Sequence, residues 1–220
     1  MGREFIPIFK EWANTYDATV NGEDPEYQEV FRYYPDLLAE IAEKSSAFVL
    51  EFGSGTGNLT LALVERGKQV IAIEPSEDMR KVAQKKPALR EVAFLDGDME
   101  AFPMLSDPID TIVSSYVFHH LNEEEKQRAI AKYAALLPVG GKVIFGDTMF
   151  LSLDHKTATI SQAIEDGYLQ LSADLQREYY PLIPDIDRYF RQHGFRSRFK
   201  QINAFVWLIE AIKVEGANKQ

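Results

Sequence analysis

The sequence predicts an α/β fold, with one mostly parallel sheet of seven strands and helices on both of its faces. Between residues 47 and 146, short apolar runs alternate with segments whose apolar residues recur at helical spacing. Such alternation is typical of parallel strands joined by crossover helices. A glycine-rich stretch, GSGTG, directly follows the first apolar run. Two further runs, at 195–200 and 204–209, predict a final antiparallel pair of strands.

The first two strands are expected at 47–52 and 69–74. The run AFVLEF at 47–52 is almost wholly apolar, as in a strand buried on both faces. A helix is expected from 58 to 66, because its apolar residues are helically spaced and Gly67 is a common type of helix stop. The run QVIAIE at 69–74 is rich in β-branched residues. Pro75 ends it, and Ser76 can cap a helix that extends to about residue 85.

Three further strands are expected at 91–95, 109–115 and 142–145. The connection between the first two of these carries no clear pattern of its own. Asn122, with Glu125 three positions later, resembles a capping box and predicts a helix that ends near residue 137. The residues PVGG at 138–141 break this helix before the last of the three strands.

The chain is expected to form a single domain over residues 1–220, because no linker interrupts it. Two helices are predicted at 3–16 and 26–44, and residues 156–192 are predicted to be helical with interruptions at Pro181 and Pro184. These segments are expected to cover the ligand edge of the sheet. The predicted parts are an N-terminal helical cover (1–45), a cofactor-binding core (46–148), a second helical cover (149–192) and a terminal strand pair (193–212).

Composition and charge exclude several classes of function. The net charge of −10 argues against a general nucleic-acid binder, because phosphate backbones are bound by clustered Lys and Arg. No apolar run approaches the ~20 residues needed to span a membrane, and the first residues do not resemble a signal peptide. The absence of cysteine excludes disulfides, thiolate zinc sites and a cysteine nucleophile. We therefore expect a cytoplasmic protein without a membrane or nucleic-acid partner.

One basic cluster lies late in the chain and leaves two interpretations open. It is either a solvated face or a patch that faces RNA. Its members are Arg188, Arg191, Arg196, Arg198 and Lys200.

The stretch VLEFGSGTGN at 49–58 has the pattern E-x-G-x-G-x-G. Ligands of open α/β sheets bind beyond the carboxyl ends of the strands, where glycines let the backbone approach closely. Dinucleotides use G-x-G-x-x-G, which fails in both possible frames because Asn58 and Thr60 stand where glycine is required. Glu51, at the end of the strand, would repel a pyrophosphate but suits a cationic amino-acid ligand.

These residues resemble the first motif of the class I S-adenosylmethionine-dependent methyltransferases, whose fold is Rossmann-like. The resemblance implies that Glu74 holds both ribose hydroxyls of S-adenosyl-L-methionine. It also implies that Asp98 accepts from the adenine amino group and that the main-chain N–H of Met99 reaches the ring. Taken alone, Glu74 could instead face solvent and Asp98 could be a cap. The implied cofactor-binding residues are Tyr16, Gly53, Ser54, Gly55, Glu74, Pro75, Asp98, Met99 and Ser115.

The resemblance covers essentially the whole chain. DTIVSSYVFHHL (110–121) and LLPVGGKVIF (136–145) resemble the family's segments around the fourth and fifth strands. Together with WANTYDATV (12–20) and FVWLIEAIK (205–213), they are similar to a small bacterial group, the YrrT-like methyltransferases. Membership of this group implies methyl transfer but defines no acceptor.

His119 and His120 follow the predicted fourth strand, beside the place where the methyl group is expected to emerge. Histidine titrates near neutral pH, so one of them is a candidate general base if the acceptor must lose a proton. The alternative is a packing or orienting role for both. We expect no metal site, because no nearby set of Asp and His residues has typical ligand spacing.

The predicted function is methyl transfer from S-adenosyl-L-methionine to a small molecule of undefined identity. The acidic net charge and the two covers, which would enclose a pocket, favour a small-molecule acceptor over a macromolecule. Two alternatives are a catalytically silent protein that binds S-adenosylmethionine or S-adenosylhomocysteine, and an NAD-dependent oxidoreductase. The failed dinucleotide pattern argues against the oxidoreductase. Neither the methylated atom nor the oligomeric state is indicated.

Overall fold

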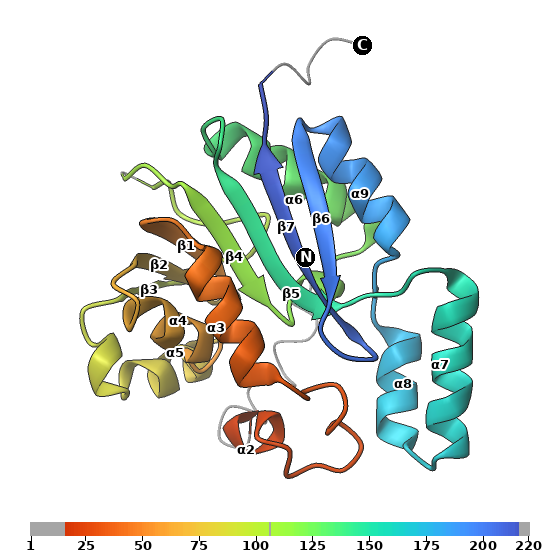
Figure 1. Cartoon of the computed structure of the whole chain (residues 1–220). Helices are drawn as coiled ribbons and strands as arrows, with labels where there is room; N and C mark the ends of the chain where they lie inside the picture. The colour runs from red at the N-terminus through yellow and green to blue at the C-terminus, as the bar shows by residue number, and fades with distance from the viewer. Residues whose placement is uncertain (1–15, 106, 216–220) are drawn as a thin grey trace.

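A seven-stranded sheet runs through the computed structural model of the chain, which describes residues 16–105 and 107–215 (Figure 1). The strand order is β3-β2-β1-β4-β5-β7-β6. Strands β1 to β5 pair in parallel, while β7 pairs antiparallel with β5 and β6. The predicted mostly parallel sheet is therefore confirmed. The strands are β1 Phe48–Phe52, β2 Gln69–Ile73, β3 Ala93–Leu95, β4 Thr111–Ser115, β5 Lys142–Thr148, β6 Phe195–Gln201 and β7 Val206–Lys213.

The strand order reverses beside β1, and this determines where a ligand can bind. Leu50 of β1 is in register with Ile71 of β2 on one side and with Ile112 of β4 on the other. From β1 the chain moves outward to β2 and β3, and it then crosses back to β4 and β5. In open α/β sheets the ligand crevice forms at the carboxyl ends of the strands at such a point.

Helices cover both faces of the sheet, as predicted (Figure 1). Both predicted caps are confirmed: Ser76 Oγ accepts from the Met79 N–H, and Asn122 and Glu125 form a capping box. Among the described residues, no helix has the length and apolar character needed to cross a membrane. The helices are α2 Tyr16–Val20, α3 Tyr34–Lys44, α4 Asn58–Val64, α5 Glu77–Gln84, α6 Glu123–Leu136, α7 Leu153–Glu165, α8 Leu169–Arg177 and α9 Ile183–Gln192, with 3-10 turns at Pro87–Leu89 and Phe118–His120.

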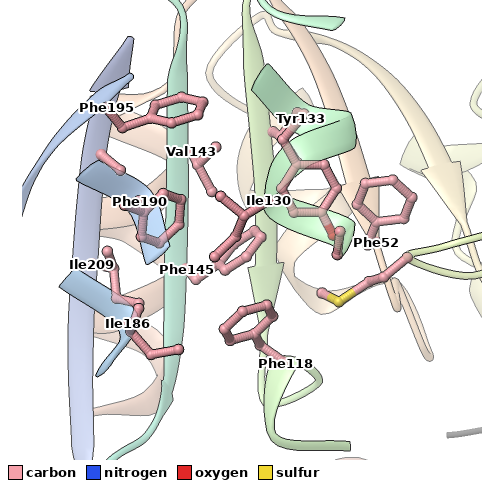
Figure 2. Close-up of a cluster of buried hydrophobic side chains, with 14 of the residues drawn as sticks. Phe52, Phe118, Ile130, Tyr133, Val143, Phe145, Ile186, Phe190, Phe195 and Ile209 are labelled. Atoms are coloured by element: carbon pink, nitrogen blue, oxygen red, sulfur yellow. The ribbon is translucent and has the colours of Figure 1, made fainter. Parts of the chain in front are cut away.

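Successive side chains of β1 pack into two different cores, because neighbouring residues of a strand point to opposite faces. Val49 packs with Ile41 of α3 and Leu63 of α4 on one face. On the other face Phe52 packs against Tyr133 of α6, with ring centroids 5.6 Å apart. Helices α6 and α9 complete this second core (Figure 2). Each fully buried large side chain contributes about 1.5–3 kcal/mol to folding.

The N-terminal cover differs from the predicted pair of helices. Of the helix expected at 3–16, only Tyr16 belongs to the described residues, and it begins α2. The helix expected at 26–44 begins only at Tyr34, because residues 25–33 form turns. Tyr33 has a φ of 66°, a left-handed conformation that ends the preceding turns. Pro35 lies in the first turn of α3, where its missing N–H has no helical partner to lose.

The segment after β5 forms the three helices α7, α8 and α9. Helices α7 and α8 lie side by side beyond the edge of the sheet (Figure 1). The chain breaks between α8 and α9, as Pro181 suggested, but Pro184 does not interrupt a helix. It lies in the first turn of α9, where proline favours helix initiation.

The basic residues late in the chain divide between α9 and β6. Arg188 and Arg191 form ion pairs with acids of their own helix, and Lys200 Nζ lies 2.7 Å from Glu40 Oε2. The three basic side chains are more than half exposed, which is typical of a solvated face.

Asn203 attaches the N-terminal cover to the sheet from the loop between β6 and β7. Its Nδ2 donates to the carbonyl oxygens of Val30, at 3.1 Å, and Arg32, at 2.9 Å. Its Oδ1 accepts from the N–H groups of Phe205, at 2.9 Å, and Val206, at 2.7 Å. The side chain is buried, so its loss would leave these backbone groups without partners in a poorly solvated place.

We expect Asn203→Ala to lower the free energy of unfolding by about 2–4 kcal/mol, because several hydrogen bonds of roughly 1 kcal/mol each are lost. Urea unfolding followed by circular dichroism measures this change. The control is Gln28→Ala, which removes an exposed side-chain hydrogen bond to Gly22 in the same cover. If both variants are equally stable, Asn203 does not hold the cover.

Candidate active site

A cavity opens at the carboxyl ends of β1, β2 and β4, where the strand order reverses. The space between its walls, including the part that is open to solvent, is about 690 Å³. Its lining residues are Tyr16, Gly53, Gly55, Glu74, Pro75, Met79, Asp98, Met99, Ser115, Tyr116, Val117, His120 and Leu121.

Two glycines of the loop after β1 keep part of the cavity wall free of side chains. Gly53 has a φ of 65°, and an added Cβ would lie 2.3 Å from Val117 Cγ2, so a larger residue does not fit. Gly55 has a φ of 52°, and an added Cβ would meet no atom within 4 Å. Because Gly55 lines the cavity, the open space beside it is available to a ligand.

Glu74 is buried directly after β2 and ties this strand to the glycine loop. Its Oε2 accepts from the Gly55 N–H at 2.9 Å, and its Oε1 accepts from the Ser76 N–H at 2.8 Å. Burial raises the pKa of the carboxyl, while the two N–H donors act in the opposite direction. Each oxygen has a second lone pair, so a carboxylate in this place can accept two further hydrogen bonds from a ligand.

Asp98 and Met99 follow β3 in a tight turn. Asp98 Oδ1 accepts from the N–H groups of Glu100, at 2.9 Å, and Ala101, at 2.7 Å. The Asp98 N–H donates to the Ala101 carbonyl oxygen at 2.7 Å. These bonds fix the conformation of the turn, in which Asp98 and the buried Met99 both line the cavity.

Helix α2 brings Tyr16 to the cavity and is fastened to the glycine loop by its neighbour Asp17. Asp17 Oδ1 accepts from Thr56 Oγ1 at 2.7 Å and from Asn58 Nδ2 at 3.0 Å. The part of the N-terminal cover that the structure describes therefore contributes directly to the cavity wall.

Tyr116 lines the cavity in an unusual backbone conformation. Its φ is 57°, which is uncommon for a residue other than glycine and costs energy in an aromatic residue. Its hydroxyl donates to the Val30 carbonyl oxygen at 3.0 Å, and its ring lies 5.0 Å from that of Phe31, centroid to centroid. The N-terminal cover thus holds a strained tyrosine at the cavity.

All the cofactor-binding residues that the sequence predicted line this cavity, except Ser54. Ser54 is buried in the glycine loop, and its N–H donates to the Ile73 carbonyl oxygen. Three apolar, non-aromatic lining residues were not predicted from the sequence: Met79, Val117 and Leu121. They are ordinary apolar residues, and no sequence signal distinguishes an apolar cavity wall from a core.

The two histidines occupy different environments. His119 does not line the cavity, and both of its ring nitrogens face carboxylates. Nδ1 lies 2.5 Å from Asp147 Oδ1, and Nε2 lies 3.1 Å from Glu178 Oε2. Burial opposes protonation of the ring, but the two acids outweigh it and raise the pKa of His119 to about 10. With both nitrogens engaged, His119 is poorly suited to the general-base role considered from the sequence.

His120 lines the cavity and is the histidine that a ligand can reach. Burial, assisted by the neighbouring charge of His119, lowers the pKa of His120 to about 3. A neutral imidazole at this place can accept a hydrogen bond, but its low pKa makes it a weak proton acceptor and argues against the general-base role considered from the sequence. Adjacent histidines therefore differ because distant acids raise the pKa of His119, whereas burial lowers that of His120.

A buried lysine holds the segment that brings Glu178 to His119. Lys126 Nζ donates to the Tyr179 carbonyl oxygen at 2.5 Å and lies 2.8 Å from Glu123 Oε1. The Tyr179 N–H donates to the His119 carbonyl oxygen at 3.1 Å. The second cover is therefore fixed to the edge of the sheet beside the cavity. Sequence reasoning missed Lys126, Asp147 and Glu178, because nothing local marks them as partners of His119.

Glu51, the glutamate that precedes the glycine loop, is buried beneath that loop. Its Oε2 accepts from Thr60 Oγ1 at 2.6 Å. Burial raises the pKa of Glu51 to about 8, against the opposing effect of the hydrogen bond from Thr60. The carboxyl group is consequently protonated in the folded protein at neutral pH.

Comparison with known protein families gives one domain match and a set of close relatives. Residues 49–141 match the family model described as a methyltransferase domain. A relative from Anoxybacillus flavithermus is 49% identical over 213 residues, covering 97% of this chain and 100% of the relative. Another, from Oceanobacillus iheyensis, is 50% identical over 214 residues, with coverage of 97% and 100%. Both carry the name uncharacterized methyltransferase.

Solved structures share the fold at low sequence identity. The magnesium protoporphyrin IX methyltransferase of Synechocystis PCC 6803 with bound SAH has a TM-score of 0.66 at 18% identity, covering 94% of this chain and 99% of that one. A DhpI–SAH complex has a TM-score of 0.71 at 15% identity and covers 98% of both chains.

The raised pKa of Glu51 predicts a stability that falls as pH rises from about 4.5 to about 8. In this window the unfolded chain releases the Glu51 proton while the folded chain keeps it, so rising pH favours unfolding. We expect Glu51→Gln to remove this contribution, so the variant gains stability relative to the wild type between pH 5 and pH 8. Urea unfolding at each pH measures the difference. Glu65→Gln, at the exposed end of α4, is the control, and the same pH profile for Glu51→Gln and the wild type would refute the assignment.

Proposed function

The chain belongs to the methyltransferase domain family, and on that premise we propose that it transfers a methyl group from S-adenosyl-L-methionine to a small-molecule acceptor. The observation that carries the cofactor proposal is Glu74, a buried carboxylate beside a side-chain-free glycine loop. It lies at the point where the strand order reverses, which is the usual ligand site of this architecture.

The chemistry of the cavity fits S-adenosylmethionine better than a dinucleotide. Among the described residues, the lining contains the carboxylates Glu74 and Asp98 and no lysine or arginine. A pyrophosphate carries negative charge and would be repelled by these acids. S-adenosylmethionine has no phosphate, and its amino and sulfonium groups are positive. The open space beside Gly55 gives the ligand room to approach the backbone.

Each lining residue has a task that its chemistry suits. Glu74 accepts from the two ribose hydroxyls, and Asp98 accepts from the adenine amino group while the Met99 N–H reaches the ring. Gly53 and Gly55 leave room for the methionine portion, beside which Pro75, Ser115 and Tyr16 line the cavity, while the buried Ser54 supports the loop through its N–H bond to Ile73. When bound, the cofactor supplies a methyl group on a positively charged sulfur, which is activated for displacement by a nucleophile. The protein has to align that nucleophile and exclude water.

The acceptor side of the cavity is formed by His120, Tyr116 and Leu121. His120 is the one imidazole in the described lining, so its neutral ring can orient an acceptor hydroxyl, thiol or amine by accepting a hydrogen bond from it. The aromatic and apolar neighbours keep this part of the site poor in water. The described part of the N-terminal cover forms part of the cavity wall through Tyr16, which supports a small molecule as acceptor rather than a macromolecule.

Thermal unfolding with S-adenosylmethionine, S-adenosylhomocysteine and NAD tests the cofactor proposal. A ligand at about 100 times its dissociation constant adds about 2.7 kcal/mol, or roughly 5–11 °C for a chain of this size. We expect this rise with both adenosyl compounds in the wild type and its loss in Glu74→Ala. Glu77→Ala, on the exposed side of α5, should behave as the wild type does. A rise with NAD alone, or with none of the three, overturns the proposal.

Release of S-adenosylhomocysteine from S-adenosylmethionine, in the presence of a panel of small phenols, thiols and amines, tests turnover. We expect His120→Ala to slow this release by about 10²-fold, the usual cost of a misplaced reacting group. The thermal shift with S-adenosylhomocysteine should stay unchanged, because His120 serves the acceptor side. His193→Ala, in a histidine outside the cavity, is the control. Equal rates in both variants would remove His120 from the mechanism, and binding without any turnover would favour a silent binding protein.

A further inference from the structure

We propose that His119, His120 and Glu178 form a binding site for a divalent transition-metal ion of the zinc class, at the inner edge of the cavity. One ligand atom from each of the three side chains lies within 4.8 Å of the other two. All three side chains are buried or nearly so. Two imidazoles and one carboxylate are a common ligand set for catalytic zinc, in which a fourth position stays open.

The spacing of the ligand atoms is close to what such an ion requires. Metal–ligand bonds of about 2.0–2.1 Å in a tetrahedral site separate neighbouring ligand atoms by about 3.3 Å. His119 Nε2 and Glu178 Oε2 are 3.1 Å apart, so this pair already has the required separation. The remaining separations, which reach at most 4.8 Å, close with a rotation of side chains.

The partners of the ligands also match a metal site. Histidines that bind metals usually donate their other ring N–H to a carboxylate, which fixes the ring. Asp147 Oδ1 lies 2.5 Å from His119 Nδ1, and the N–H groups of His119 and Thr148 in turn hold Asp147 at 3.1 and 2.7 Å. Tyr180 donates its hydroxyl to Glu178 Oε2 at 2.8 Å. Asp147 and Tyr180 therefore fix the orientations of the two proposed ligands His119 and Glu178.

Two buried carboxylates lie beside the proposed site. Asp147 Oδ1 and Glu178 Oε2 face the two ring nitrogens of His119, at 2.5 and 3.1 Å. The rings of His119 and His120 pack together with their centroids 4.1 Å apart. A cation held by the three ligands would therefore lie close to two acids and beside two imidazoles.

His120 connects this site to the cavity, since it belongs to both. The open position of the ion would face the acceptor side, where a bound hydroxyl or thiol becomes more acidic. This last step rests on the proposed function, and the acceptor would then be an oxygen or sulfur nucleophile activated by the ion. Glu178 was not foreseen as a ligand because it lies far along the chain from the two histidines.

Metal binding is measured directly on the full chain, without any methyl acceptor. The protein is treated with EDTA, dialysed, and titrated with Zn²⁺ and with Co²⁺, followed by metal analysis after gel filtration and by the visible spectrum of Co²⁺. We expect about one ion per chain in the wild type, as for a single site. Glu178→Gln and His120→Gln should weaken binding by more than about 100-fold, and Asp147→Asn, behind the ligand, by about 10–100-fold.

Two matched variants serve as controls. Glu165→Gln removes an exposed carboxylate at the end of α7 in the same cover, and His193→Gln removes a histidine elsewhere, so both should bind as the wild type does. No bound ion in the wild type, or equal binding in all variants, overturns the proposal. Circular dichroism identifies any variant that fails to fold, and the wild-type Co²⁺ spectrum reports whether the bound ion has the low coordination number expected of the site. The thermal shift with S-adenosylhomocysteine is scored separately, so failure of the metal site is distinguishable from failure of the cofactor proposal.

Discussion

The carboxylate of Glu74 is the constraint on which the rest of the site depends. It follows β2, yet its two oxygens accept N–H groups from Gly55, in the loop after β1, and from Ser76, the cap of α5. One side chain therefore ties a strand, a loop and a helix into a single rim at the ligand edge of the sheet. The hydrogen bond from the Gly55 N–H to Glu74 fixes the backbone of the glycine loop. Because this loop has no side chain at Gly53 or Gly55, a ligand can lie directly against its backbone.

Three separate attachments hold the two covers around this rim. Asp17 bonds α2 to the glycine loop, and Asn203 bonds the following turns to the end of the sheet. Lys126 bonds the second cover to the segment that follows β4, through the Tyr179 carbonyl oxygen. All three are polar groups that act on backbone or loop atoms across long stretches of sequence. Because of these attachments, residues of the core and of both covers lie close together around the cavity. Tyr116, in its strained conformation, is held there by its hydrogen bond to the Val30 carbonyl oxygen.

The parts that could be predicted are those that local sequence determines. The strands, the caps of α5 and α6, and the positions of the glycines and Glu74 follow from residue types within a few positions of each other. The late start of α3 could not be read from apolar spacing, because the left-handed Tyr33 decides it. The separation of the histidine roles depends on Asp147 and Glu178, which meet His119 only in the folded chain. The apolar lining residues Met79, Val117 and Leu121 carry no sequence signal that separates them from core residues.

The most direct test is a crystal structure of the chain with S-adenosylhomocysteine. We expect the ligand in the cavity between β1, β2 and β4, with its ribose hydroxyls on the Glu74 carboxylate and its adenine beside Asp98 and Met99. The sulfur should face His120, since that residue lines the acceptor side. A ligand bound elsewhere, or bound in this cavity without contact to Glu74, would contradict the assignment of the site.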